Sequence, residues 1–269
     1  MPELSGPPAT SLNFTLRALY APKEGNTDAQ YEDAWAVSEA GEASGIVTAA
    51  PLLTVAVSDG ASSAIFARDW ARRLVAAFSA SEPGAGATDS LISDIVGAEG
   101  RLWREEVETR ATSWHAQEKL HSGSAATLLV VSLDADARTW QAFAIGDVCL
   151  FLVRAGKLKY AFPVPKSSSF DDRPALLSTE GRAALPTVKR FGAAIDPGDR
   201  FLLMTDALAA WFLAGFEKKR RPWDALPTDA EAFAALVQKE RDAARMKNDD
   251  ATLIEILVSE SVLSSSLPQ

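Results

Sequence analysis

Short acidic segments that border apolar runs of strand length place the strongest constraint on how this chain can fold. One apolar run, residues 52–58 (LLTVAVS), ends on an acidic residue, and residues 200–205 (RFLLMT) lead into another. Residues 251–258 (ATLIEILV) follow an acidic pair. Since these runs have the pattern of buried strands, their ends would place acidic side chains at the edge of a sheet. The four segments are Glu32-Asp33, Asp59-Gly60, Asp206 and Asp249-Asp250.

Carboxylates gathered from four strands would repel one another strongly unless cations lay between them. Mg²⁺ and Mn²⁺ suit such a cluster, because these hard divalent ions prefer oxygen ligands and keep several waters. The sequence therefore predicts a metal-dependent hydrolase. Asp-Gly and Asp-Asp are also common in turns and helix caps, so an ordinary structural role for these residues is the alternative.

Composition argues against several other classes of protein. The formal net charge is −9 and no basic stripe is present, so we expect no nucleic-acid binding. No apolar stretch approaches the roughly 18 residues of a membrane span, and we expect no membrane association. The single cysteine, Cys149, lies in an apolar run. We therefore expect a buried strand residue, no internal disulfide and a reducing, cytoplasmic compartment.

The order of the expected elements indicates an α+β fold. Strand patterns occupy residues 13–20, 34–38, 52–58, 126–133, 140–145, 148–154, 157–162, 188–194, 200–205 and 251–258. Helical spacing of apolar residues follows a cap at Ser62 or Ser63, and recurs in residues 90–117, 207–216 and 229–247. Because strands and helices do not alternate one by one, we expect antiparallel sheets with the helices outside them.

We expect one domain over residues 12–259, with a flexible leader at 1–11 and a flexible tail at 260–269. Within it, residues 126–162 have the pattern of an antiparallel meander, because turn sequences separate the strands. Residues 163–187 contain Pro163, Pro165, Pro174 and Pro186 and predict a long irregular insertion. Such a loop is either a flap that shapes substrate access or a simple surface excursion.

Six motifs follow one another in a recognisable order: Glu32-Asp33-Ala34, VSDGASS (57–63), GSAATLLVVSL (123–133), AIGDVCLFLVRAGKL (144–158), LLMTDAL (202–208) and NDDATLIEI (248–256). Together they resemble the metal-dependent protein phosphatases, the PPM type that is also called protein phosphatase type 2C. The resemblance extends from about Leu12 to Val258. It implies a four-layer α-β-β-α sandwich, in which helices flank two central antiparallel sheets and two Mn²⁺ or Mg²⁺ ions lie at one end.

Matched residue by residue, the resemblance implies a role for each acidic segment. Asp59 would bridge both ions. Glu32 and the carbonyl oxygen of Gly60 would complete one site, and Asp206 and Asp249 would complete the other. The chemistry favours the same arrangement, since two cations lower the pKa of water and offset the charge that develops on a phosphoryl group.

Three further acidic residues are expected outside the metal ligands. Asp33 would hold metal-bound water, which makes it an expected catalytic residue together with Asp59 and Asp206. Asp250 stands where the family usually has Asn, and Asp147 belongs to the Gly-Asp motif; both are expected in the outer shell. A third ion in this family needs another Asp near residue 210. Here the stretch 208–210 is Leu-Ala-Ala, which argues against a third site.

The family's phosphate-binding Arg has no clean counterpart near the first acidic pair. Lys23 and Arg17 are the nearest basic residues, and Lys23 is preferred for substrate binding because it lies in the loop that leads to the site. An ordinary surface lysine is the alternative. His115 and His121 lie outside the motifs and are not expected to contact the substrate.

The leading prediction is a protein phosphatase that hydrolyses phosphoserine and phosphothreonine through attack of a metal-activated water. Its partners would be phosphorylated proteins and a kinase that acts on the same targets, and we expect a monomer. A regulatory relative that kept the fold without catalysis is the alternative, favoured by Ala207 in place of the usual Gly. A phosphatase for small phosphomonoesters is a third interpretation.

Overall fold

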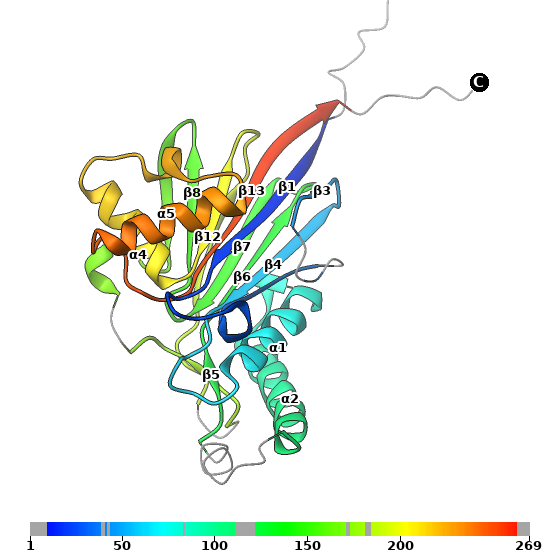
Figure 1. The fold of residues 1–269 in the computed structure, drawn as a ribbon. Helices are drawn as coiled ribbons and strands as arrows, with labels where there is room; N and C mark the ends of the chain where they lie inside the picture. Colours follow the sequence, from blue (N-terminus) through cyan, green and yellow to red (C-terminus); the bar gives the residue numbers. More distant parts are fainter. Residues whose placement is uncertain are drawn as a thin grey trace, which may run out of the picture.

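Two stacked antiparallel sheets form the centre of the described part of the chain (Figure 1). The computed structural model describes residues 10–38, 41, 44–82, 84–110, 122–170, 173–180 and 184–262. The larger sheet has the order β3 (Ile46–Thr48), β1 (Thr10–Ala21), β13 (Ala251–Val262), β12 (Arg200–Met204), β8 (Cys149–Arg154) and β9 (Lys157–Phe162). The smaller sheet has the order β11 (Lys189–Ala194), β7 (Thr139–Ile145), β6 (Leu128–Asp134), β4 (Leu52–Ser58) and β2 (Ala34–Val37).

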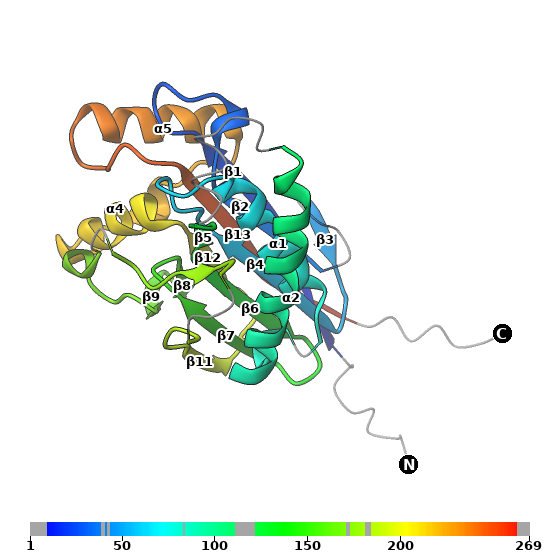
Figure 2. The ribbon, with the colours of Figure 1, turned by 90° about the horizontal axis from the view of Figure 1, so that it is seen from below.

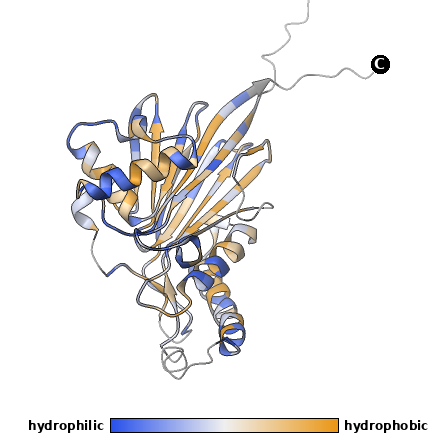
Figure 3. Cartoon of the chain, viewed as in Figure 1, coloured by the Kyte–Doolittle hydropathy of each residue, from blue (hydrophilic) through white to orange (hydrophobic). Residues whose placement is uncertain are grey.

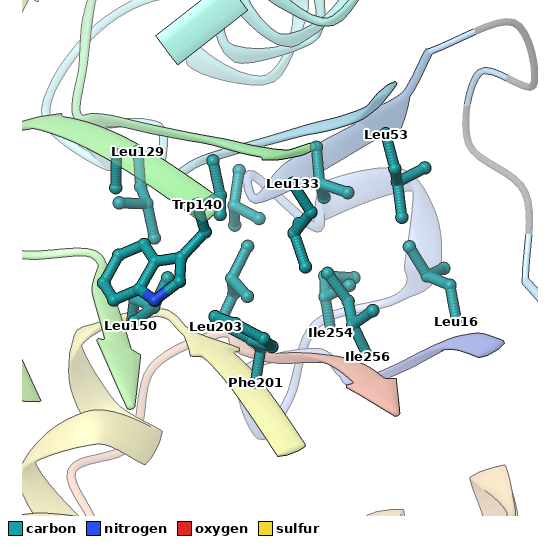
Figure 4. Close-up of a cluster of buried hydrophobic side chains, with 14 of the residues drawn as sticks. Leu16, Leu53, Leu129, Leu133, Trp140, Leu150, Phe201, Leu203, Ile254 and Ile256 are labelled. Carbon is teal, nitrogen blue, oxygen red and sulfur yellow. The ribbon is translucent and has the colours of Figure 1, made fainter. Parts of the chain in front are cut away.

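The side chains of each central strand alternate between two apolar layers. In β12, Phe201 and Leu203 point into the layer between the sheets, whereas Leu202 and Met204 belong to the layer under the helices. Figure 4 shows Phe201 and Leu203 facing Leu129 of the opposite sheet. Because both faces of these strands are covered by apolar side chains, their sequences are continuous apolar runs.

Helices cover the outer face of each of the two central sheets (Figure 2). The helices α1 (Ala67–Ala80) and α2 (Asp89–Glu108) pack on the smaller sheet, and α4 (Asp206–Glu217) and α5 (Ala230–Asp242) pack on the larger one. In Figure 3 the strands are mainly hydrophobic, while the helices combine hydrophobic and hydrophilic residues. This is the four-layer α-β-β-α sandwich, so the predicted fold class is confirmed.

Cys149 is buried in β8, as predicted. None of the helices in the described ranges combines the length and the apolar character needed to cross a membrane.

The segment 126–162 does not form one meander, and this prediction is wrong. Strands β6 and β7 pair in the smaller sheet, whereas β8 and β9 pair in the larger one. The chain changes sheets at residues 146–148. Gly146 has φ 102°, and a Cβ atom there would lie 2.6 Å from Cγ2 of Thr127. This close crossing depends on glycine, and it places Asp147 where the ends of both sheets meet.

Several boundaries also differ from the predicted ones. Strand β1 begins at Thr10 and β13 ends at Val262, so the expected domain boundaries at 12 and 259 fall inside strands. Helix α1 begins at Ala67, and neither Ser62 nor Ser63 caps it.

Two long segments are described only in part. Helix α2 ends at Glu108 instead of near 117, and residues 111–121, with His115 and His121, lie outside the described residues. The described part of 163–187 is largely irregular, apart from η3 (Ser167–Ser169) and β10 (Leu177–Ser178), which pairs with β5 (Ala125–Ala126).

Replacing Leu203 with Ala should destabilise the protein by about 2–5 kcal/mol, because the side chain is fully buried and its loss leaves a cavity. Leu102 on α2 is 47% exposed, so Leu102→Ala should change stability by no more than about 0.5 kcal/mol. Urea unfolding of both variants measures the difference. Equal losses would contradict the placement of Leu203 in the layer between the sheets.

Candidate metal centre

Antiparallel pairing brings the acidic segments to one end of the sandwich. Strand β12 ends next to the start of β13, with Met204 opposite Leu253, so Asp206 and Asp249 lie at the same edge. Strand β2 starts opposite the end of β4, with Ala34 paired to Ser58. The residues just before β2 therefore lie beside those just after β4.

Four acidic residues from separate segments line a single cavity of about 220 Å³. Asp59 follows β4, Asp147 lies between β7 and β8, Asp206 begins α4, and Asp249 precedes β13. The structure thus brings together residues that the sequence singled out. Asp206 differs in detail, because it is the first helical residue and not a strand end. Ala207 is helical with an ordinary φ, so the usual Gly is not required there.

Thr127 fixes the backbone around Asp59. The N–H of Asp59 donates to Oγ1 of Thr127 at 3.0 Å, and the N–H of Thr127 donates to the carbonyl of Asp59 at 2.9 Å. The hydroxyl of Ser58 donates to the carbonyl of Thr127 at 2.6 Å. These bonds hold Asp59 against β6 at the end of the smaller sheet. Sequence reasoning did not single out Thr127, although a hydroxyl residue at the start of the predicted strand 126–133 was a usable signal.

Gly60 lies where a side chain would not fit. A Cβ atom at this position would lie 2.8 Å from the carbonyl oxygen of Glu32 and 3.0 Å from the carbonyl carbon of Ala67. The backbone of residue 60 is therefore in close contact with the loop before β2 and with the start of α1. This close approach explains the Asp-Gly sequence independently of any metal.

Asp250 holds the loop that carries the first acidic pair. Its two carboxylate oxygens accept hydrogen bonds from the backbone N–H of Lys23 at 2.7 Å and of Glu32 at 2.6 Å. Burial raises the pKa of Asp250, although these two hydrogen bonds oppose the shift. Asp250 thus ties residues 23–32 to the start of β13. Arg17, the other basic residue considered for the substrate, instead pairs with Glu255 at 2.9 Å.

Asp33 is buried beside the cavity with one oxygen unpartnered. Its Oδ2 accepts from the hydroxyl of Thr252 at 2.5 Å, and Thr252 also contacts the hydroxyl of Tyr31. Its Oδ1 is buried and has no hydrogen-bond partner in the described part of the chain. Burial and the nearby charge of Asp250 raise the pKa of Asp33 well above its usual value. An unpartnered buried carboxylate oxygen is costly unless water or a cation satisfies it.

Burial, followed by mutual repulsion, disfavours the charged form of the carboxylates in the cavity. Burial raises the pKa of Asp59 well above its usual value, and the charges of Asp33 and Asp206 add to the shift. Burial likewise raises the pKa of Asp206, where Lys247 opposes the shift and Asp249 adds to it. The folded protein therefore holds its carboxylates in an environment that disfavours their charged form.

Lys247 is the cation that the structure places among these carboxylates. Its Nζ lies 2.9 Å from Oδ2 of Asp249 and 3.4 Å from Oδ2 of Asp206. Burial alone would lower the pKa of Lys247, but its contacts with Asp249 and Asp206 raise the pKa overall. Sequence reasoning missed this residue, although its position two residues before Asp249 was a signal of proximity.

The donor set fits hard divalent cations, although the described side chains do not form a compact group of ligands. Within residues 10–262, where described, no three acidic, His or Cys side chains form a group that could hold a metal ion. The cavity nevertheless offers hard oxygen ligands from carboxylates whose repulsion a cation would relieve. Asp33, whose charge acts on Asp59, has a buried oxygen without a hydrogen-bond partner in the described part of the chain. A cation bound by Asp206 and Asp249 would have to displace Lys247 from their oxygens.

Comparisons with known proteins identify the family. The family model described as protein phosphatase 2C matches residues 27–257, and the chain belongs to this family. A search of curated proteins found no matching sequence.

Solved phosphatases share the fold at low sequence identity. The serine/threonine phosphatase PstP/Ppp of Mycobacterium tuberculosis is 18% identical, with a TM-score of 0.56 and coverage of 92% of this chain and 99% of that chain. The photosystem II phosphatase PBCP is 15% identical, with a TM-score of 0.56 and coverage of 91% and 98%. RsbX, solved in complex with magnesium, is 18% identical, with a TM-score of 0.52 and coverage of 92% and 96%.

Gly60→Ala should destabilise the protein by about 1–3 kcal/mol, because its Cβ would be forced against the backbone of Glu32 and Ala67. Gly97 in α2 is the matched control. A Cβ there meets only Nη1 of Arg101 at 3.9 Å, so Gly97→Ala should stabilise the helix by about 0.5–1 kcal/mol. Chemical denaturation of both variants measures the change in unfolding free energy, which should have opposite signs for the two substitutions. A Gly60→Ala variant as stable as the wild type would show that the loop before β2 is not in close contact with residue 60.

Asp59→Asn should raise the melting temperature of the chelator-treated protein at pH 7.5 by about 2–4 °C, the shift that about 1 kcal/mol produces in a domain of this size. The pKa of Asp59 is raised on folding, so the native state binds more protons than the unfolded chain above pH ~4. The stability of the metal-free protein therefore falls as pH rises toward the native pKa.

The gain from Asp59→Asn should accordingly be smaller at pH 5 than at pH 7.5. Asp136 is exposed, and Asp136→Asn should leave the melting temperature unchanged at both pH values. Differential scanning calorimetry in chelator provides the measurement. A variant less stable than the wild type at pH 7.5 would contradict the conclusion that burial and repulsion make the Asp59 carboxylate destabilising.

Proposed function

We propose that the protein is a metal-dependent phosphatase that removes phosphate from phosphoserine and phosphothreonine in proteins. One observation carries the proposal: Asp59, Asp147, Asp206 and Asp249 line a single cavity at one end of a protein phosphatase 2C fold. Such a site contains no activated Cys or Ser-His pair among its lining residues, and its chemistry rests on hard oxygen ligands.

Two Mn²⁺ or Mg²⁺ ions would be held by the residues matched to the family motifs. Asp59 would contact both ions, with Glu32 and the carbonyl of Gly60 on one side and Asp206 and Asp249 on the other. PstP solved with two manganese ions, 18% identical with a TM-score of 0.53, supports the choice of ions. When bound, such ions lower the pKa of water and offset the negative charge of a phosphoryl group.

The chain's own residues would orient the reactants around these ions. Asp33 would hold a water molecule through its unpartnered Oδ1, because Thr252 already occupies its Oδ2. Asp250 would position Glu32 through the backbone bond it accepts, and Asp147 would act from the outer shell. With Leu208-Ala209-Ala210 in the stretch where a further Asp would be needed, we propose two ions and not three.

The insertion at 163–187 is the candidate for a flap over the site. Pro174 and Leu176 line the same cavity as Asp59, which favours a role in substrate access over a simple surface excursion. Phosphorylated proteins and a kinase that acts on the same targets are the proposed partners of a cytoplasmic, monomeric enzyme. Serine/threonine phosphatases among the proteins of similar fold support phosphoproteins as the substrate class.

A regulatory module without catalysis is the second candidate. The contacts of Lys247 with Asp206 and Asp249 favour it, because an ammonium group there competes with a metal ion for the same oxygens. The presence of Asp59 and Asp147 in the same cavity favours the enzyme.

Hydrolysis of p-nitrophenyl phosphate with and without Mn²⁺ tests the proposal. We expect metal-stimulated activity that falls at least about 100-fold in Asp206→Asn, because losing a metal ligand removes stabilisation of the developing charge. Asp94 is exposed on α2, so Asp94→Asn serves as the matched control and should retain full activity.

Titration calorimetry with Mn²⁺ reports metal binding separately from turnover. Equal activity of Asp206→Asn and wild type would remove Asp206 from the metal site. Metal binding without any hydrolysis would favour the regulatory module, and a phosphopeptide that is inert where p-nitrophenyl phosphate reacts would favour small phosphomonoesters.

A further inference from the structure

A second cavity, of about 650 Å³, adjoins the candidate metal centre. It shares Ser62 with the cavity of the metal centre, and Glu32, a predicted metal ligand, forms part of its wall. Its size lies within the range of cavities that bind small molecules and peptide side chains. A group bound there would therefore lie next to a phosphoryl group at the metal centre.

The lining of this second cavity is basic, in contrast to the acidic protein as a whole. The formal net charge of the chain is −9. Two acidic residues, Glu32 and Asp69, line the cavity beside four basic ones: Lys23, Arg68, Arg72 and Arg110. A concentration of cations in one concave region of an acidic protein creates a local positive potential that attracts anions.

Arg110 does not supply free positive charge to this cavity. Its Nη1 lies 2.9 Å from Oδ2 of Asp69, and its guanidinium lies over the ring of Phe66, 4.7 Å from the centroid. These contacts neutralise Arg110 and hold it in place at one wall.

Arg68 contributes an uncompensated positive charge to this cavity. Its Nη1 donates to the backbone carbonyl of Asp28 at 2.7 Å, in the short helix η1 (Asp28–Gln30) that precedes Glu32. Its Nε is buried and has no hydrogen-bond partner, and no described carboxylate lies within ion-pair distance of its guanidinium. A guanidinium fixed by a neutral carbonyl keeps its full charge and several donors for a ligand.

The start of α1 adds to the positive potential. Phe66 and Ala67, at its N-terminus, line the same cavity, and no side chain caps the first turn. The exposed N–H groups of a helix start favour negative charge nearby. Lys23, on the opposite loop, is positioned by the bond from its backbone N–H to Asp250.

We propose that this basic cavity is a subsite for an acidic side chain that flanks the phosphorylated residue of the substrate. Arg68 is the principal contact and Lys23 the second. This inference rests on the proposed phosphatase function and specifies its substrate class, namely phosphopeptides with Glu or Asp near the phosphorylated residue. Ser62 lines both cavities, so the flanking group and the phosphate would bind side by side.

Binding of two labelled peptides to the Mn²⁺-loaded protein tests the subsite without turnover. Both carry a non-hydrolysable phosphonate analogue of phosphothreonine and differ only in having Glu or Gln at the flanking positions. Fluorescence anisotropy should show about tenfold tighter binding of the Glu peptide, the effect of one charge-assisted hydrogen bond. Raising the salt concentration should reduce this preference.

Arg68→Ala should abolish the preference for Glu over Gln, and Lys23→Ala should reduce it. Arg101 is exposed on α2 and lines neither cavity, so Arg101→Ala should keep the full preference. Thermal melting establishes whether each variant is folded. If Arg68→Ala does not fold, the reduced preference of Lys23→Ala tests the subsite. Equal binding of both peptides by the wild type, or a preference that survives in Arg68→Ala, would overturn the subsite.

Hydrolysis of the corresponding phosphothreonine peptides separates this inference from the proposed function. A Glu preference in binding without any hydrolysis in Mn²⁺ would support the subsite and contradict the phosphatase. Hydrolysis of both peptides with equal kcat/KM would support the phosphatase and contradict the subsite. A higher kcat/KM for the Glu peptide that is lost in Arg68→Ala would support both.

Discussion

The apolar layer between the two sheets determines where the strands end, and the candidate metal centre depends on those ends coinciding. Leu203 of β12 and Ile254 of β13 are paired neighbours that both point into this layer. Slipping one strand by a single residue would turn its apolar side chains out of the layer, so the register is strongly specified. The register in turn places Asp206 beside Asp249, although 43 positions separate them in the sequence numbering.

The same packing forces an unfavourable concentration of negative charge. Burial and mutual repulsion raise the pKa of Asp59 and Asp206, so the sandwich is stable despite its acidic end and not because of it. Lys247 offsets part of the repulsion through its contacts with Asp206 and Asp249. A local conflict of this kind, inside an otherwise consistent fold, is characteristic of functional sites.

The loop before β2 links the acidic cavity to the basic one. On one side Asp250 accepts the backbone N–H groups of Lys23 and Glu32, and on the other Arg68 donates to the carbonyl of Asp28. Both anchors act on the backbone of the loop. The position of Glu32 in the wall of the basic cavity is therefore set from the start of β13 and from α1 together.

The sequence alone was sufficient for the fold class, the positions of most strands and the family, because strand alternation and short motifs are properties of neighbouring residues. It also singled out the acidic residues that line the cavity. The sheet change at Gly146, the anchoring of the loop by Asp250, and the places of Lys247 and Arg68 were decided only by the tertiary structure. Each of these depends on contacts between distant segments, such as the 218 positions between Glu32 and Asp250, which no local pattern records.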